Sequence, residues 1–220
     1  MKLKLSRNTL KLIAVIAMLV DHISYLFLDE LGVIGISLRF IGRITYPIMA
    51  FMLVEGYYHT KDYTKYLFRM FGISVISCVA CAFFSSAWIP FSAVVTLFLG
   101  LIVLGIYNSE IKLDMKMAYI FIILCLSILC EYSLWGVMLI LLFAVFRNKK
   151  SLLMLSYLVM IVIQVLLNIN DTYLIQFGLL LVIPLILLYD GKKSDSKVNK
   201  LYYYFYPIHL VVLKLIELML

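Results

Sequence analysis

The sequence predicts an all-α fold: a polytopic bundle of about nine transmembrane helices with a cytoplasmic amino terminus. Three observations support this. First, 65% of the 220 residues are hydrophobic and only 14% are charged, which leaves too little polar surface to cover a water-soluble domain. Second, the apolar residues form runs that approach the ~20 residues needed to cross a hydrocarbon core. Third, 16 of the 19 Lys and Arg residues lie at every second gap between those runs, as the positive-inside rule requires of a threaded chain.

Polar clusters divide the chain into nine apolar segments. The second segment is long, which indicates tilt or a kink at Pro47. The fourth and sixth are short. The fifth and sixth could merge into one buried helix broken near Glu131, but the charges on either side require two crossings there. The predicted segments are 9–28, 33–58, 65–84, 91–107, 115–130, 133–147, 151–168, 172–189 and 201–220.

The loop charges set the orientation. Cations precede the first segment and follow the second, fourth, sixth and eighth, whereas the intervening gaps hold no Lys or Arg. Because an excess of Lys and Arg marks cytoplasmic loops, the amino terminus is predicted inside and the carboxyl terminus outside. The loop cations are Lys2, Lys4, Arg7, Lys11, Lys61, Lys65, Arg69, Lys112, Lys116, Arg147, Lys149, Lys150, Lys192, Lys193, Lys197 and Lys200.

The whole chain, residues 1–220, is predicted to form a single integral-membrane domain. Its formal net charge of +7 does not indicate nucleic-acid binding, because the basic residues lie in short loops rather than on one face. Their expected partner is the anionic cytoplasmic leaflet of the bilayer. His22, His59 and His209 show no matched metal-ligand spacing, so no metal is expected.

A few ionisable residues remain inside the apolar segments. In the predicted threading, three helices bring a carboxylate, two imidazoles and two guanidiniums to similar depth. A charged side chain at the bilayer centre costs at least ~2.5 kcal/mol, so such residues commonly mark function. Lys214 can snorkel to the outer surface and is assigned no role. The others are Asp21, His22, Arg39, Arg43, Glu55 and His209.

The predicted catalytic set is Asp21, His22, Arg39, Arg43 and His209. The two arginines are four residues apart and share one helical face. If Asp21 neutralises one, donors remain for a substrate carbonyl, carboxylate or phosphate; alternatively, Arg39 snorkels outward and Arg43 pairs only with Asp21. His22 can serve as a general base, since a neutral imidazole is cheap to bury, or it is a hydrogen-bonded core residue.

A second group of residues is predicted to bind substrate. Tyr206 lies three residues before His209 on the same face, and Pro207 is expected to bend that helix. Glu55 lies near the inner mouth, where a purely interfacial role is an equal alternative. The predicted substrate-binding residues are Tyr46, Glu55, Lys61, Lys65, Arg69 and Tyr206.

Five stretches in chain order carry a family resemblance: 10–14 leading to 18–23, then 38–48, 53–60, 184–192 and 205–210. Together they resemble the TraX family of conjugation-associated membrane proteins. The resemblance implies membership of a wider set of multi-span acyltransferases in the bacterial cytoplasmic membrane, one of which acetylates the amino terminus of a conjugative pilin. It also implies that the family's polar signature comprises Asp21, His22, Arg39, Arg43, Glu55 and His209.

The resulting hypothesis is acyl transfer within the membrane. An acyl-CoA donor, acetyl-CoA by the resemblance, approaches from the cytoplasm with its phosphates near Lys61, Lys65 and Arg69; no tightly bound cofactor is expected. His22, or alternatively His209, takes a proton from an extracytoplasmic acceptor, which is a pilin amino terminus, a glycan or a small molecule. The two arginines stabilise the oxyanion that forms.

Two other classes of function stay open. A proton-coupled transporter or exporter would use the same buried charges as a proton relay. A non-catalytic scaffold of a conjugation or secretion system would use them only to hold helices together.

Overall fold

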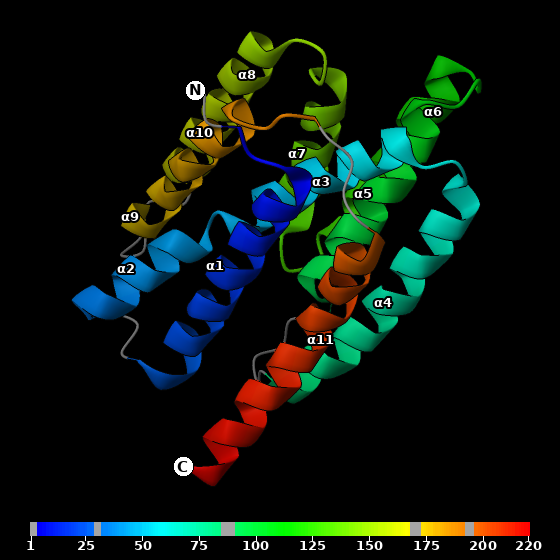
Figure 1. Cartoon of the computed structure of the whole chain (residues 1–220). Coiled ribbons are helices and arrows are strands. Elements are labelled where there is room, and N and C mark those ends of the chain that lie inside the picture. Colours follow the sequence, from blue (N-terminus) through cyan, green and yellow to red (C-terminus); the bar gives the residue numbers. More distant parts are fainter. Residues whose placement is uncertain (1–3, 29–31, 85–90, 168–172, 192–195) are drawn as a thin grey trace. The chain divides into compact units, whose positions relative to one another are not determined.

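A computed structural model of the chain describes residues 4–28, 32–84, 91–167, 173–191 and 196–220 (Figure 1). These residues form helices joined by turns, and their only β-type pairings are two isolated bridges. The chain divides into two compact units. The first comprises Met1–Met49 and Asn148–Leu220, and the second comprises Ala50–Arg147.

In the first unit, α1 (Arg7–Phe27) packs against both α2 (Val33–Gly42) and α11 (Ser196–Met219). Ser6 caps α1, because its hydroxyl accepts a hydrogen bond from the Thr9 amide at 3.2 Å and so satisfies one of the orphan donors at a helix start. Also in this unit is α8 (Lys150–Leu167), which packs against the segment that follows it.

The second predicted segment is interrupted before Pro47 rather than at it. After Gly42 the residues Arg43 and Ile44 form a turn, and α3 (Thr45–His59) begins. Proline has no amide proton, and its ring crowds the carbonyl four residues earlier, which here belongs to Arg43. The helix therefore breaks at Arg43, and Pro47 occupies the first turn of α3, where proline is tolerated.

The eighth predicted segment is one helical stretch in which the 3-10 helix η1 (Phe177–Leu181) lies between α9 (Tyr173–Gln176) and α10 (Val182–Leu187). In lipid, a carbonyl that loses its α-helical hydrogen bond in such a stretch needs another partner. The Tyr157 hydroxyl of α8 donates to the Leu179 carbonyl at 3.0 Å. On the other side, a Cβ at Gly178 would overlap the Phe40 carbonyl, so η1 lies directly against α2.

The second unit contains most of α3 and four further helices: α4 (Tyr63–Phe84), α5 (Ala93–Tyr107), α6 (Leu113–Ser127) and α7 (Ser133–Val145). The central helix is α5, which packs against α4, α6 and α7. A Cβ at Gly100 would overlap the Ile140 side chain, so glycine allows α5 and α7 to approach closely. Glu131, in the turn between α6 and α7, accepts a hydrogen bond from the Ala93 amide at 2.9 Å and so caps α5.

The protein is an all-α membrane bundle, as predicted. Each of the nine predicted apolar segments is helical where it is described, and α6 and α7 are separate helices, as the loop charges require. Outward-facing side chains such as Phe68, Val79 and Phe121, which are 70%, 70% and 66% exposed, suit a hydrocarbon solvent. Among the described residues, the helices long and apolar enough to cross a membrane are Arg7–Phe27, Val33–His59 (α2 and α3 taken together), Tyr63–Phe84 and Lys150–Leu167. Shorter apolar helices are Ala93–Tyr107, Ser133–Val145 and Phe177–Leu187.

The number of crossings, the cytoplasmic side and the single-domain organisation stay predictions.

Candidate functional site

Three helices of the first unit bring together most of the ionisable residues predicted at membrane depth. Asp21 and His22 lie on α1, Arg39 lies on α2, and His209 lies on α11. Because α1 contacts both α2 and α11, its two adjacent polar residues reach two different neighbours. Successive side chains on a helix diverge by about 100°, and Asp21 therefore serves α2 whereas His22 serves α11.

Asp21 forms an ion pair with Arg39. The distance from Arg39 Nε to Asp21 Oδ1 is 3.7 Å, and the Arg39 guanidinium also lies 5.6 Å from the centre of the Tyr25 ring. The close approach depends on Gly42, because a Cβ at that position would overlap the Asp21 carboxylate. The sequence-based expectation that Asp21 neutralises one of the arginines agrees with this geometry.

Side chain-to-backbone hydrogen bonds also join α1 to α2 and to the first residue of α3. The Ser24 hydroxyl, fully buried, donates to the Gly35 carbonyl at 3.2 Å. The Thr45 hydroxyl donates to the Ala14 carbonyl at 3.3 Å. Polar contacts of this kind join helices in membranes, where lipid offers no competing hydrogen bonds. The Asp21–Arg39 pair thus lies between two hydrogen bonds that also hold α1 in place, Ser24–Gly35 on one side and Thr45–Ala14 on the other.

The two histidines contact each other. His209 Nε2 lies 3.4 Å from His22 Nδ1, and the ring centroids are 4.9 Å apart at an angle of 70°. Each Nδ1 also points to the carbonyl one turn earlier, at 2.7 Å from Met18 O for His22 and 2.8 Å from Phe205 O for His209. Since a carbonyl can only accept, each neutral ring carries its proton on Nδ1. The basic lone pair of each ring is therefore on Nε2.

His209 is held in a defined orientation. It is 5% exposed, its ring stacks on Phe205 at 4.9 Å with an interplanar angle of 10°, and Tyr206 meets its edge at 5.7 Å. Pro207 lies inside α11 between these residues. Tyr206 is thus next to His209, on the same face of α11, as the sequence predicted.

Arg43 acts on the same carboxylate as Arg39. Its Nε is buried and, like the Nε of Arg39, makes no hydrogen bond to the described residues. Its charge acts on Asp21, and its Cβ faces Gly178 of η1. The carbonyl groups at the end of α2 lower the cost of burying a cation by up to ~2 kcal/mol. Burying one cation costs at least ~2.5 kcal/mol, and Arg39 and Arg43 share the same carbonyl groups, so these groups do not offset the cost of both arginines.

The remaining predicted substrate-binding residues are distributed between the units. Tyr46 is buried in the first unit, at 4% exposure. In the second unit, Lys65 Nζ pairs with Asp62 at 3.2 Å, and Arg69 lies over the Tyr66 ring at 5.7 Å. Lys61 is exposed. Whether any of these residues contacts a substrate stays a prediction.

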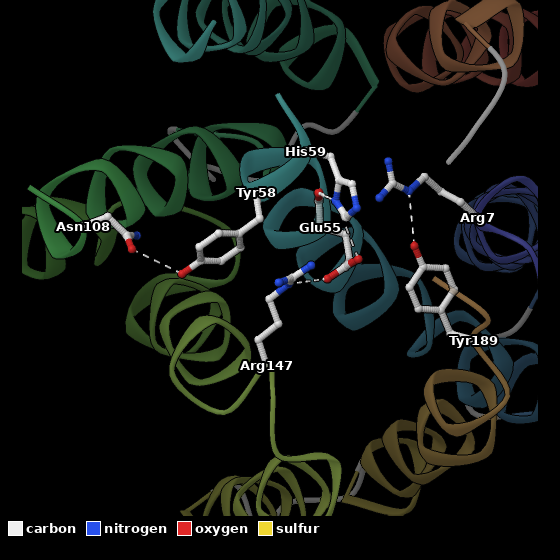
Figure 2. Close-up of polar contacts among 7 residues, drawn as sticks. All are labelled: Arg7, Glu55, Tyr58, His59, Asn108, Arg147 and Tyr189. Carbon is white, nitrogen blue, oxygen red and sulfur yellow. Dashed lines mark hydrogen bonds and ion pairs between the residues drawn. The ribbon is translucent and has the colours of Figure 1, made fainter. Parts of the chain in front are cut away.

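Glu55 forms the centre of a polar cluster in the second unit (Figure 2). It is 5% exposed, and its Oε1 lies 2.6 Å from Arg147 Nε. The Arg147 guanidinium also covers the Tyr58 ring at 4.8 Å, and the Tyr58 hydroxyl donates to Asn108 at 3.4 Å. His59 donates from Nδ1 to the Glu55 carbonyl at 2.7 Å. The sequence assigned Arg147 only to the loop charges, so its ion pair with Glu55 was missed.

Arg7 was also assigned only to the loop charges, yet it is 8% exposed. Its Nε donates to the Tyr189 hydroxyl at 3.4 Å (Figure 2). Around this contact the Leu5 amide donates to the Leu188 carbonyl at 2.8 Å, and the Asp190 amide donates to the Leu5 carbonyl at 3.0 Å. The start of α1 is therefore joined to the chain after α10. Tyr189 lies in one of the stretches that carried the family resemblance, which was the available signal.

Fold and site together define a class of protein: a polytopic helical membrane protein whose first unit encloses an Asp–Arg ion pair beside a histidine pair. Among the described residues, no three His, Cys, Asp or Glu side chains are placed to hold a metal ion. The chain belongs to the TraX protein family, whose family model matches residues 6–217.

One relative is the probable fimbrial assembly protein FimC, serogroup H1, of Dichelobacter nodosus. It is 30% identical over 225 residues, which cover 93% of this chain and 92% of the relative. No solved structure matches this chain.

Proposed function

We propose that this protein is a membrane-embedded acyltransferase that transfers an acetyl group from acetyl-CoA to an acceptor outside the cytoplasm. The observation that carries the proposal is the contact between His22 and His209, 3.4 Å apart, beside the Asp21–Arg39 ion pair. Buried imidazoles next to a fixed guanidinium supply both a base and a cation that stabilises an oxyanion.

The proposed reaction uses His22 Nε2 as the base. It takes the proton of an acceptor amine or hydroxyl while the acceptor attacks the thioester carbonyl of the donor. Arg39, whose charge acts on His22 as well as on Asp21, stabilises the oxyanion of the tetrahedral intermediate. When the carbon–sulfur bond breaks, the proton on His22 passes to the departing thiolate, and acetylated acceptor and free CoA remain.

His209 has a positioning role in this scheme. Its Nε2 faces the Nδ1 proton of His22, and that contact keeps the protonated nitrogen away from the acceptor. Asp21 likewise has a positioning role, because its ion pair holds the Arg39 guanidinium in place. Lys61, Lys65 and Arg69 are the cations proposed to meet the phosphates of the donor, because Lys61 lies in the short connection between α3 and α4 and the other two lie in the first two turns of α4.

The acceptor proposed is the amino terminus of a pilus or fimbrial subunit. Two facts support this choice: the chain belongs to the TraX family, and its relative is named as a probable fimbrial assembly protein. The amino group of a membrane-anchored subunit would reach the outer half of the bilayer, where the predicted threading places Asp21 and His22.

The test uses purified protein in lipid nanodiscs with radiolabelled acetyl-CoA and a synthetic peptide that carries a fimbrial-subunit amino terminus. Wild type is expected to acetylate the peptide. His22→Ala is expected to lose 10²- to 10⁴-fold, the range for a general base. His59→Asn is the matched control, because His59 makes the same contact to a carbonyl one turn earlier but lies in the second unit. A fully active His22→Ala variant would remove that residue from the mechanism, and intact wild-type protein that acetylates nothing would refute the proposal.

A proton-coupled transporter is the second candidate. It is favoured by the 3-10 helix η1 between α9 and α10, because a 3-10 stretch inside a helix often marks a functional hinge. The two proposals separate in sealed proteoliposomes. An enzyme transfers acetyl groups without a proton gradient, whereas a transporter moves its solute only in response to one.

A further inference from the structure

The orientation of the His209 ring decides what its two nitrogens contact. Nδ1 donates to the Phe205 carbonyl at 2.8 Å, and Nε2 lies 3.4 Å from Nδ1 of His22. A half-turn of the ring about its bond to Cβ would put a carbon atom in each of these places, so both contacts would be lost. Rotation about this bond has broad minima in histidine rather than sharp staggered ones. The surroundings of His209 must therefore select one orientation of the ring.

The contact to the carbonyl one turn earlier does not make this selection alone. His22, His59 and His209 all place Nδ1 at 2.7 or 2.8 Å from the carbonyl four residues before them. In an α-helix that carbonyl also accepts the backbone amide of the same histidine. A contact that all three histidines make, to a carbonyl already in use, does not explain why His209 faces a second imidazole.

His209 differs from the other two histidines in the side chain one turn earlier. The corresponding residues are Met18 before His22 and Glu55 before His59, whereas an aromatic residue precedes His209. The Phe205 ring stacks on the His209 imidazole, with centroids 4.9 Å apart and planes inclined by 10°.

The two contacts between Phe205 and His209 act on different features of the imidazole. Stacking of the two rings fixes the plane of the imidazole. The Phe205 carbonyl then selects the edge of that plane that carries the Nδ1 proton.

The stacked ring also blocks the exchange of one edge for the other. To turn over, the His209 ring must pass through an orientation perpendicular to the present one, in which one edge points into the volume of the Phe205 ring. His209 is 5% exposed and the Tyr206 ring lies 5.7 Å from it, and closely packed surroundings leave little room for a side chain to move aside. The Nε2 atom of His209 therefore stays directed at His22.

The orientation of His209 matters for the chemistry of His22. A neutral imidazole has one donor nitrogen and one acceptor nitrogen, so Nε2 of His22 can serve as a base only while the proton is on Nδ1. The hydrogen bonds made by one ring nitrogen set the tautomer. Here the Met18 carbonyl at 2.7 Å and Nε2 of His209 at 3.4 Å both face the Nδ1 atom of His22. A turn of His209 would replace the second acceptor by carbon.

We infer that the ring of Phe205 is a positioning residue of the candidate site. It holds His209 with Nε2 towards His22, and His209 in turn keeps the proton of His22 on Nδ1 and its basic lone pair on Nε2. Phe205 touches neither substrate in this scheme and acts through His209. The inference rests on the proposed function only in taking Nε2 of His22 as the base; the orientation of the two rings does not depend on it.

The experiment observes the ring nitrogens directly by NMR. The chain has three histidines, so protein labelled with ¹⁵N in histidine and placed in lipid nanodiscs gives a simple spectrum. At about pH 8 an imidazole is neutral, and its protonated and bare nitrogens have well-separated shifts. Wild type is expected to show His22 and His209 protonated on Nδ1, with a through-space correlation between Nδ1 of His22 and Nε2 of His209. A His22 protonated on Nε2, or the absence of this correlation, would overturn the inference without any variant.

The variants assign the orientation to the aromatic ring. Phe205→Leu keeps an apolar side chain without a ring, and it is expected to lose the correlation and to give His22 a second tautomer. Phe205→Tyr keeps the ring and is expected to retain both wild-type signals. Phe177→Leu, at an exposed aromatic residue of the same unit, is the matched control, and the unchanged signals of His59 are the internal reference. Wild-type signals in Phe205→Leu, or their loss in Phe205→Tyr, would contradict the role of the stacked ring.

The kinetic test separates this inference from the proposed enzyme. In the acetyl-transfer assay, Phe205→Leu is expected to lower kcat by about 10²-fold, the cost of a misplaced reacting group, with KM unchanged because no substrate contact is removed. Ring orientations that depend on Phe205, in a protein that transfers no acetyl group, would refute the acyltransferase and leave the positioning role in place. Acetyl transfer that Phe205→Leu leaves unchanged, with unchanged ring signals, would do the reverse.

Discussion

Substituting Gly42 by alanine would test the seam between α1 and α2 most directly. A Cβ at Gly42 would overlap the Asp21 carboxylate, the group that pairs with Arg39 at 3.7 Å. The methyl group therefore forces the helices apart or turns Asp21 away from its partner. Either change alters the candidate site without removing any functional group from it.

The size of the effect follows from two opposing terms. Alanine in place of a helical glycine ordinarily gains roughly 0.5–1 kcal/mol, whereas overpacking a tight contact costs about 1–3 kcal/mol. Loss of the ion pair adds to the cost. A net destabilisation of roughly 1–2 kcal/mol is expected for Gly42→Ala. Gly72→Ala is the matched control: a Cβ there meets nothing within 4 Å, so only the favourable term applies.

The assay is the apparent free energy of unfolding in mixed micelles, followed by circular dichroism during titration with a denaturing detergent. Asp21→Ala combined with Gly42→Ala should be more stable than the sum of the single effects allows, because the alanine at position 42 no longer meets a carboxylate; coupling of about 0.5–3 kcal/mol is typical of touching residues. A Gly42→Ala protein at least as stable as Gly72→Ala would refute the reasoning.

Three further predictions concern the second unit. Arg147→Gln should lower the free energy of unfolding by about 2 kcal/mol. Breaking a fully buried ion pair costs about 3–5 kcal/mol, and the loss is smaller here because the Arg147 side chain is 28% exposed. The double variant Glu55→Gln/Arg147→Gln should lose less stability than the two single variants lose together. The hydrogen bond from the Lys65 amide holds the pKa of Asp62 below its usual 3.8. The carboxylate therefore stabilises the fold fully above pH 3.8, and this stabilisation is lost as the pH falls through the lower pKa of the folded state. The stability difference between wild type and Asp62→Asn should persist at pH 7 and shrink as the pH falls below 3.8. Glu131→Ala removes the cap of α5 and should cost about 1 kcal/mol, whereas Glu131→Gln keeps an accepting oxygen and should cost less; equal losses would exclude the capping role.

The helical segments and the depth of the polar residues could be predicted from sequence because both depend on local composition. Apolar runs of the right length form helices in lipid whatever their neighbours are, and the alternating loop charges separated α6 from α7. The same threading placed Asp21, Arg39 and His209 at one depth, and the structure brings Asp21 to Arg39 and His22 to His209.

Partners that depend on tertiary packing could not be predicted in this way. Arg147 and Arg7 have the same local sequence character as the exposed loop cations, and only the fold buries them against Glu55 and Tyr189. The long second segment was expected to be tilted or to have a kink at Pro47, whereas the helix is interrupted at Arg43, because the proline ring crowds the carbonyl four residues before it. No local signal indicated that η1 would face that break, because Gly178 and Arg43 are far apart in the chain.

The placement of Asp21 and His22 as sequence neighbours has a mechanical consequence. Asp21 contacts α2 and His22 contacts α11, and the angle between the two side chains around α1 is fixed because they are neighbours on one helix. Rotation of α1 about its own axis would break both contacts together, so the two contacts resist rotation of this helix while the site is intact. A substrate that needs a wider passage would therefore enter by a sideways shift of α2 or α11, while α1 keeps its position.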